Sequence, residues 1–220
     1  MFKLTYSVNS MRPALLLTAC AMLSACATPL LNERQKLDFD AMIEKTLSEP
    51  SCCSSLESLK VDSQIDRTKT ISVRLIPGAQ VFELETGKSF VHLMKLPSND
   101  KPYDVKLHLP TEESVLSLLP SVLILDEQFN VVNRMDLAAE DFQWAMGTTI
   151  FQEVTADPKT ARYALIYTKP ADFGKEFKLS IDVGIASTSY RKLLSPIGYV
   201  NVSLVKKGCR VFSCDLPALE

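Results

Sequence analysis

Histidine and tryptophan are scarce in this sequence, which contains two histidines and one tryptophan among 220 residues. Hydrolytic triads and many zinc sites need histidine, so this inventory leaves little for either kind of site. The sequence also lacks a run of basic residues, and its formal net charge is −2. Nucleic acid is therefore not an expected partner, because phosphate binding needs clustered Lys and Arg. We expect no catalytic residue, no cofactor and no bound metal.

Acidic residues are absent before Glu33, whereas Lys3 and Arg12 lie in the first twelve residues. An apolar and small-residue run follows from Pro13 to Ala25, and it is too short to span a bilayer as a finished helix. This layout is typical of a secretory signal peptide. The run leads into Leu23-Ser24-Ala25-Cys26, which resembles a bacterial lipobox.

We therefore expect residues 1–25 to be removed and Cys26 to carry fatty acyl chains such as palmitate. A competing lipobox ends at Cys20, but cutting there would leave an apolar segment of only about seven residues. A plain secreted protein is the other alternative. Several acyl chains anchor a protein stably, since each buried methylene contributes ~0.8 kcal/mol. Ala27 follows the cysteine rather than Asp, which in the lipoproteins that this resembles favours the outer membrane, with the domain facing the periplasm.

The remaining chain has the size of one domain. Without residues 1–25, which contain two basic residues and no acidic one, 22 basic and 26 acidic residues remain. About 195 residues can bury roughly 70% of their unfolded surface in one core. We expect residues 26–50 to form a lipidated tether with a short helix, and residues 51–220 to form a single periplasmic domain.

Four cysteines remain once Cys20 and Cys26 are assigned to the leader and the lipid: Cys52, Cys53, Cys209 and Cys214. An even number in an oxidising compartment predicts disulfides. Bonds from the adjacent pair to the C-terminal cysteines are expected, with ~4–5 kcal/mol of stabilisation in the entropy model. A bond within the pair ranks last of the three connectivities, because it needs a strained ring. A zinc site would need a spacer in each cysteine pair, and a redox enzyme would need Cys-x-x-Cys.

Hydrophobic spacing predicts one helix followed by many strands. Leu37, Ala41 and Leu47 have helical spacing and predict an amphipathic helix within residues 27–49, ending before Pro50. From residue 71 the apolar period is mostly two, with regular turn signals. Only residues 111–119 and 137–146 have a helical or irregular character. The sequence predicts a mainly β protein, an antiparallel β-sandwich with a short N-terminal helix and one or two short helical insertions.

Two motifs have a structural interpretation. The stretch Thr86-Gly87-Lys88-Ser89 ends like a Walker A loop, but Phe82 stands where the first glycine should be, so we interpret it as a hairpin turn. His92 lies between two apolar neighbours in period two, without an oriented partner nearby in the sequence, so we expect a partly buried, satisfied histidine. His108 shares a strand face with Asp104 and Lys106, and we expect it to be solvated.

Trp144 is the candidate ligand platform. A sugar ring can stack on an exposed indole, but large aromatic side chains are more often buried, so core packing is the first interpretation and a platform the second. The same ambiguity applies to four tyrosines: Tyr103, Tyr163, Tyr167 and Tyr199. The carboxylate pairs Glu112-Glu113 and Glu140-Asp141 lack the apolar setting that would raise one pKa, so glycosidase chemistry is not indicated.

A lipobox is followed in order by CCSSLESL (52–59), IPGAQVFELETGKSFVHLMKLP (76–97) and PSVLILDEQFNVV (120–132). This order resembles the maltose operon periplasmic protein family (MalM) over residues 26 to about 135. The resemblance implies an envelope protein linked to maltose or maltodextrin uptake, in a family without defined catalytic residues. The tail with Cys209 and Cys214 has no place in the family pattern.

We therefore expect a non-catalytic outer-membrane lipoprotein with a periplasmic β-sandwich, accessory to maltose or maltodextrin uptake. The alternative is a structural or protein-interaction lipoprotein of the cell envelope with no sugar ligand. The expected partners are the membrane, through the lipid, and either maltodextrin or an envelope protein.

Overall fold

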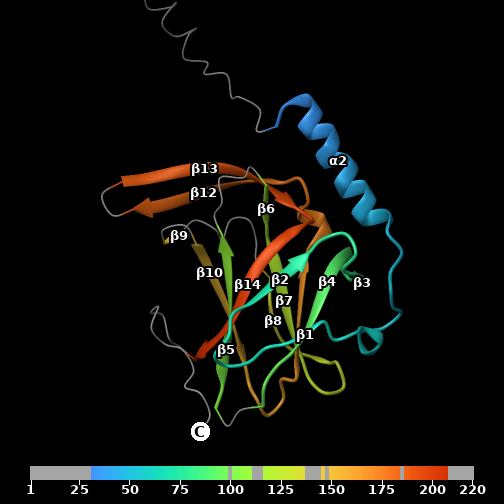
Figure 1. The fold of residues 1–220 in the computed structure, drawn as a ribbon, viewed down its shortest axis with the longest axis vertical. Coiled ribbons are helices and arrows are strands. Elements are labelled where there is room, and N and C mark those ends of the chain that lie inside the picture. Colours follow the sequence, from blue (N-terminus) through green and yellow to red (C-terminus); the bar gives the residue numbers. More distant parts are fainter. Residues whose placement is uncertain are drawn as a thin grey trace, which may run out of the picture.

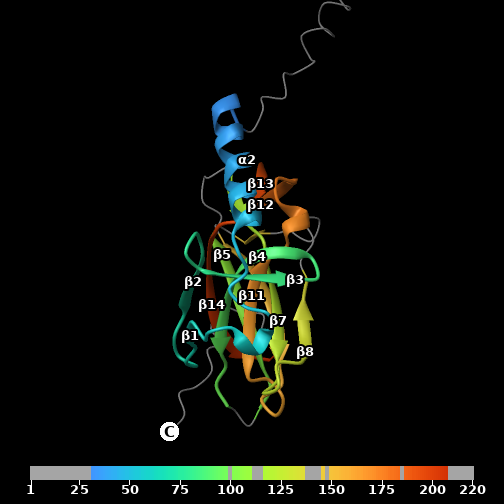
Figure 2. The same cartoon turned by 90° about the vertical axis from the view of Figure 1, so that its right-hand side faces the viewer.

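The computed structural model describes residues 31–98, 101–110, 116–136, 145–146, 149–183 and 186–207. These residues form two β-sheets that pack face to face, with one α-helix beside them (Figure 1). Figure 2 shows the layers side on, with β2, β5 and β14 in one and β4, β11, β7 and β8 in the other. The predicted mainly β sandwich is confirmed.

Helix α2 (Glu33–Ser48) begins at Asn32, whose side chain accepts a hydrogen bond from the Gln35 N–H at 2.8 Å. The Gln35 side chain accepts one from the Asn32 N–H at 3.0 Å, so both halves of a capping box are present. The helix ends two residues before Pro50, as predicted.

The predicted buried face of α2 is wrong. Leu37 is 70% exposed and Leu47 is also exposed, whereas Phe39 and Thr46 are the buried residues of the helix. Positions 39 and 46 are seven residues apart, about two helical turns, and therefore lie on one face of the helix. This face differs from the one predicted from Leu37 and Leu47. Phe39 contacts the loop at Gly174, where a Cβ atom would lie 3.7 Å from the Phe39 ring.

The smaller sheet has six strands: β1 (Ser63–Gln64), β3 (Gln80–Leu84), β4 (Gly87–Lys95), β7 (Pro120–Leu125), β8 (Val131–Met135) and β11 (Tyr163–Thr168). Their order is β1-β4-β11-β7-β8, and β3 also pairs with β4. Strand β1 runs parallel to β4, and the other pairs are antiparallel.

The larger sheet has eight strands: β2 (Ile71–Leu75), β5 (Tyr103–Pro110), β6 (Leu116–Leu118), β9 (Ala145–Met146), β10 (Thr149–Ala156), β12 (Glu176–Val183), β13 (Ala186–Ser195) and β14 (Gly198–Lys206). Their order is β2-β14-β5-β10-β9-β12-β13-β6. The two end strands of this order, β2 and β6, both contact β14.

The hairpin predicted at Thr86–Ser89 is present, and a second hairpin joins β7 to β8 in the same sheet. The turn before Gly87 joins β3 to β4, and Gly87 has φ of +109°, a conformation that glycine adopts without steric cost. This confirms the Thr86–Ser89 stretch as part of a hairpin. Strands β7 and β8 are joined through Asp126, whose carboxylate accepts hydrogen bonds from the N–H groups of Gln128 and Asn130 at 2.9 and 2.8 Å.

The expected helical insertions are wrong where the structure describes them. Residues 116–118 form β6, which pairs with β13, and residues 145–146 form β9, which pairs with β10 and β12. β6 and β9 are only three and two residues long, too short to show a period of two, and their partners β13 and β12 lie far away in the sequence, so local periodicity does not reveal the pairing. The rest of both segments, residues 111–115 and 137–144, lies outside the described residues.

Apolar side chains form two clusters. The inner core lies between the sheets and includes Val73 and Leu107 of the larger sheet with Phe90 and Ile166 of the smaller. The outer cluster lies on the opposite face of the smaller sheet and consists of Leu59, Phe82, Val91, Leu93, Leu123, Leu125, Leu165 and Tyr167. Residues Cys53 and Leu56 pack against the outer cluster, so the segment before β1 covers part of this face.

Candidate functional site

The candidate site residues Cys26, Trp144, Cys209 and Cys214 lie outside the described part of the chain. The carboxylate pairs Glu112-Glu113 and Glu140-Asp141 lie outside it as well. Lipidation at Cys26 and a platform at Trp144 therefore stay predictions, and the described candidates are the Cys52/Cys53 pair, the histidines and the tyrosines.

The structure joins Cys52 to Cys53 by a disulfide. This connectivity was ranked last, and it replaces the bonds expected from this pair to the C-terminal cysteines. The Cα atoms are 3.8 Å apart, the spacing of neighbours across a trans peptide and shorter than in most disulfides. Both cysteines are attached to the smaller sheet. The Cys52 N–H donates a hydrogen bond to the Val81 carbonyl of β3 at 2.8 Å, and Cys53 packs on the outer cluster.

A groove of about 600 Å³ lies on the outer face of the smaller sheet. We call it the outer groove; it is lined by Leu56, Phe82, Glu83, Leu84, Glu85, Thr86, Leu123, Val131, Val132, Asn133, Arg134, Asp136 and Tyr167. Its aromatic side chains are buried in the outer cluster. The Tyr167 hydroxyl donates to the Asp136 carboxylate at 3.3 Å, and burial together with this carboxylate raises the pKa of Tyr167 to about 12. The groove therefore offers no exposed ring face to a ligand.

His92 has two partners that its sequence neighbourhood did not suggest. Its Nε2 atom is 2.7 Å from the Ser63 hydroxyl, and its Nδ1 atom is 3.8 Å from Asp62 Oδ2. The order Ser–His–Asp is that of a hydrolytic triad, but 3.8 Å is too long for a hydrogen bond. That carboxylate oxygen already accepts hydrogen bonds from the Leu93 N–H and the Gln80 side chain.

The interactions of His92 therefore fasten β1 to β4. Burial lowers the pKa of His92, and the negative charge of Asp62 opposes this shift. The prediction of a partly buried, hydrogen-bonded histidine is confirmed.

His108 is not solvated, contrary to the prediction. It shares the outer face of the larger sheet with Asp104 and Lys106, but both of these side chains are buried and His108 is partly buried. His108 Nε2 lies 2.7 Å from the Ser203 hydroxyl on the neighbouring strand β14. Burial lowers the pKa of His108, and the positive charge of Lys106 lowers it further.

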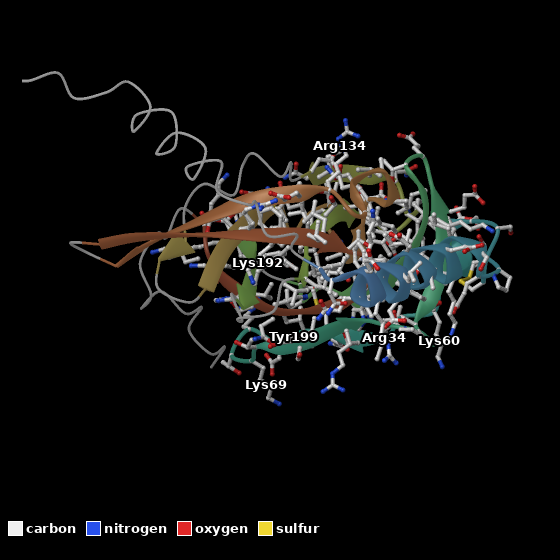
Figure 3. All side chains as sticks on the ribbon, turned by 90° about the horizontal axis from the view of Figure 1, so that it is seen from above. Arg34, Lys60, Lys69, Arg134, Lys192 and Tyr199 are labelled. Carbon is white, nitrogen blue, oxygen red and sulfur yellow. A yellow bond between two sulfur atoms is a disulfide. The ribbon has the colours of Figure 1, made fainter. Side chains whose placement is uncertain are left out.

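A second cavity, of about 510 Å³, lies where β2, β6 and β14 meet. We call it the Tyr199 cavity. Its apolar lining consists of Ile76, Leu109, Leu116, Leu118, Ile197 and Gly198, and its polar lining of Ser72, Arg74, Ser117, Ser195 and Tyr199. Figure 3 shows Tyr199 and Arg134 on opposite sides of the molecule, so this cavity and the outer groove belong to different faces.

Burial separates the four tyrosines that the sequence left ambiguous. Tyr103 is 0% and Tyr167 4% exposed, and Tyr163 stacks on Phe129 with ring centroids 4.7 Å apart. Tyr199 is 37% exposed, and among the described aromatic side chains it is the one that counts as exposed. A platform for a ligand is therefore offered by Tyr199 within the described residues.

The described residues contain neither a metal-binding group nor a membrane-spanning helix. No group of three or more His, Cys, Asp or Glu side chains is placed to bind a metal ion within these ranges. None of the described helices has the length and apolar character that a membrane-spanning helix needs.

The described residues thus define a class: a two-sheet, mainly β sandwich with a ligand-sized cavity where the two end strands of its larger sheet, β2 and β6, meet β14. Residues 86–187 match the family described as "Maltose operon periplasmic protein precursor (MalM)". This confirms the resemblance, and it extends beyond residue 135, where the sequence motifs ended, while the CCSSLESL stretch lies outside the match. No curated protein and no solved structure matches the chain.

Proposed function

We propose that this protein is an outer-membrane lipoprotein whose domain faces the periplasm, and that it assists maltose or maltodextrin uptake by binding rather than by catalysis. The observation that carries the proposal is the MalM match over residues 86–187, whose description names both the periplasm and a maltose operon. That description names no reaction.

Two further observations support the proposal. The lipobox at residues 23–26 supplies an anchor, and residues 27–32 separate this cysteine from the start of α2. Ser63, His92 and Asp62 hold β1 and β4 together, since Asp62 is too far from the imidazole of His92 to orient it by a hydrogen bond. A binding role needs only a cavity with a suitable lining, which the Tyr199 cavity supplies.

The anchor is tested by mass spectrometry of the full-length chain produced in a Gram-negative host. We expect the wild type to lose residues 1–25 and to gain the mass of acyl chains at Cys26. The variant Cys26→Ser should keep its leader and gain no lipid, whereas the matched control Cys20→Ser should be processed like the wild type. An unmodified thiol at Cys26 in the purified wild type would contradict the anchor.

The sugar function is tested with the mature lipoprotein in a detergent that carries no sugar headgroup. The chain has one tryptophan, so intrinsic fluorescence can be followed at Trp144 while maltose, maltotriose or maltoheptaose is added. We expect saturable binding in calorimetry, and a change in emission with the same affinity would place the sugar near Trp144 as well. No binding by either method at millimolar sugar would overturn the uptake role.

One observation favours the second candidate function, a protein-interaction lipoprotein. Strand β8 is an end strand of the smaller sheet, and four of its five residues are exposed, among them Val131 and Val132. End strands can pair with a strand of another protein. Crosslinking in intact envelopes should then trap a partner through β8, and added maltodextrin should not change the yield.

A further inference from the structure

We propose that the Tyr199 cavity is the subsite where one glucose unit of a maltodextrin binds, with the Tyr199 ring stacked on the sugar. This inference rests on the proposed function and locates its sugar-binding site in the structure. Pyranose rings have a face of C–H groups and a rim of hydroxyl groups. A fitting site therefore needs an exposed aromatic face, further apolar surface and several hydrogen-bonding groups around it.

The backbone register places the aromatic ring beside a cation. Tyr199 of β14 and Arg74 of β2 are directly paired in the antiparallel ladder, so their side chains leave the same face of the sheet as neighbours. Arg74 is exposed and lines the cavity with Tyr199. Within the described ranges no carboxylate forms an ion pair with Arg74. Its guanidinium N–H groups can therefore donate to sugar hydroxyls.

The remaining lining matches the two-sided character of a sugar. Ser72 of β2 and Ser117 of β6 contribute hydroxyl groups, which both donate and accept hydrogen bonds. Ile76, Leu116 and Ile197, which are exposed or partly buried, supply apolar surface for the C–H face. A volume of about 510 Å³ lies within the usual range for small-molecule sites, ~300–1,000 Å³.

A glycine maintains the shape of this cavity. A Cβ atom on Gly198 would lie 2.9 Å from the Cβ atom of Leu118, a separation that packed carbon atoms do not reach. The absence of a side chain at Gly198 therefore lets β6 approach β14 closely, although the two strands are not neighbours in the sheet order. This approach lets Ser117 and Leu118 of β6 line the cavity together with residues of β2 and β14.

The outer groove is the weaker choice for a neutral sugar. Its phenylalanine and tyrosine rings are buried in the outer cluster, so neither presents a face. The Arg134 guanidinium there lies 3.5 Å from the Asp136 carboxylate and is already paired. Its two remaining lining carboxylates, Glu83 and Glu85, give it a negative character.

The proposal is tested by calorimetry with maltoheptaose on the mature lipoprotein in a sugar-free detergent. We expect Tyr199→Ala to weaken binding roughly tenfold or more and Tyr199→Phe to stay within about threefold, because phenylalanine keeps the stacking face. Arg74→Ala should weaken binding by roughly three- to tenfold. The matched control Arg134→Ala removes an exposed arginine on the opposite face and should leave binding unchanged.

Nuclear magnetic resonance on the wild type gives a readout that does not depend on the folding of any variant. Maltoheptaose should shift the resonances of residues 72–76 and 197–199, and those of residues 131–134 should stay unchanged. If the wild type binds maltoheptaose but Tyr199→Ala binds equally well, or if the shifts occur only elsewhere, this subsite is overturned while the proposed function stands. If the wild type binds no maltodextrin at millimolar concentration, both fall.

Discussion

The two sheets of this protein differ in how many of their faces are apolar. The smaller sheet has apolar side chains on both faces: one face packs in the inner core and the other carries the outer cluster. Every residue of its strand β7 is therefore buried. The larger sheet contributes apolar side chains to the inner core, while the opposite face of β2, β5 and β14 carries serines, Arg74, His108 and Tyr199.

This difference indicates where each sheet can serve a function. A sheet with two apolar faces needs a second cover, which the segment with Cys53, Leu56 and Leu59 supplies in part. A sheet with one polar face can present hydroxyl, guanidinium and phenol groups to a ligand without exposing its core. The candidate sugar site therefore lies on the larger sheet, and the disulfide lies on the smaller.

Alanine substitutions in the two apolar clusters should have the largest effect on stability, and they test whether the outer cluster is a second core. Leu93 lies in the outer cluster and Leu107 in the inner core, and both are fully buried. Each substitution to alanine should lower the free energy of unfolding by about 2–5 kcal/mol, because each leaves a cavity in packed surroundings. Urea unfolding followed by circular dichroism measures this loss.

The matched control is Val132→Ala, which shortens an exposed aliphatic side chain on β8. It should change the stability by less than about 0.5 kcal/mol. A loss at Leu93 as small as that of the control would show that the outer face is ordinary surface, and the contrast between the sheets would disappear.

The variant Gly198→Ala tests the packing of β6 on β14 in the larger sheet, and its expected loss of stability is somewhat smaller. The added methyl group would meet the Leu118 Cβ atom, which is fixed close to the β6 backbone and cannot turn away. We expect a loss of about 1–3 kcal/mol, the usual cost of overpacking, together with weaker maltoheptaose binding. An unchanged unfolding midpoint would mean that β6 is free to move away from β14.

Much of the fold could be predicted from the sequence because its signals are local. The alternation in Ile71–Leu75 and the turn residues at Asp126 mark strands β2, β7 and β8 directly. The position of the helix could be predicted, but its buried face could not. Leu37 with Leu47 and Phe39 with Thr46 both fit a helical period, and only packing decides which pair is buried. The hairpin of β12 and β13 over residues 176–195 fits the period of two, with apolar residues alternating from Phe177 to Val183.

The candidate site depends on contacts that no local pattern contains. Four tyrosines are equivalent in the sequence, and the cavity beside Tyr199 forms only because β6, some 80 residues earlier, returns to β14. The partners of His92 were missed for the same reason, because parallel pairing of β1 with β4 brings Ser63 to it across 29 residues. The spacing of Gly198 and Leu118 carries no signal of its own.

The third prediction concerns the cover of the smaller sheet. A disulfide between adjacent residues closes a very short loop, so the variant Cys52→Ser, Cys53→Ser should lose only about 1 kcal/mol in the chain-entropy model. Bonds from this pair to the C-terminal tail would instead contribute ~4–5 kcal/mol in that model. Urea unfolding of the variant, and of the wild type with a reductant, measures the difference.

Peptide mapping of the unreduced protein identifies the connectivity independently. We expect one peptide that contains both Cys52 and Cys53 and is two hydrogen atoms lighter than its reduced form. A crosslinked peptide that joins this segment to Cys209 or Cys214 would contradict the structure, and the larger stability loss should then accompany it.

The smallest expected effect compares one histidine from each sheet. Burial lowers the pKa of His92 on the smaller sheet and of His108 on the larger, so both are neutral in the folded protein at neutral pH. The unfolded chain takes up protons near the ordinary histidine pKa of ~6.5. The folded state therefore binds fewer protons, and its stability is complete above this pH and falls as the pH is lowered through it.

We expect the free energy of unfolding to decrease from pH 8 to pH 5, and His92→Gln and His108→Gln each to flatten part of this slope. Urea unfolding at several pH values in this window is the measurement, and it stays above the range of Asp126 and Glu176, whose carboxyl pKa values are lowered by hydrogen bonds. The opposite slope, with stability rising in acid, would mean that Asp62 outweighs burial and holds His92 charged. If only His108→Gln flattened the slope, the polar face of the larger sheet alone would carry the pH dependence.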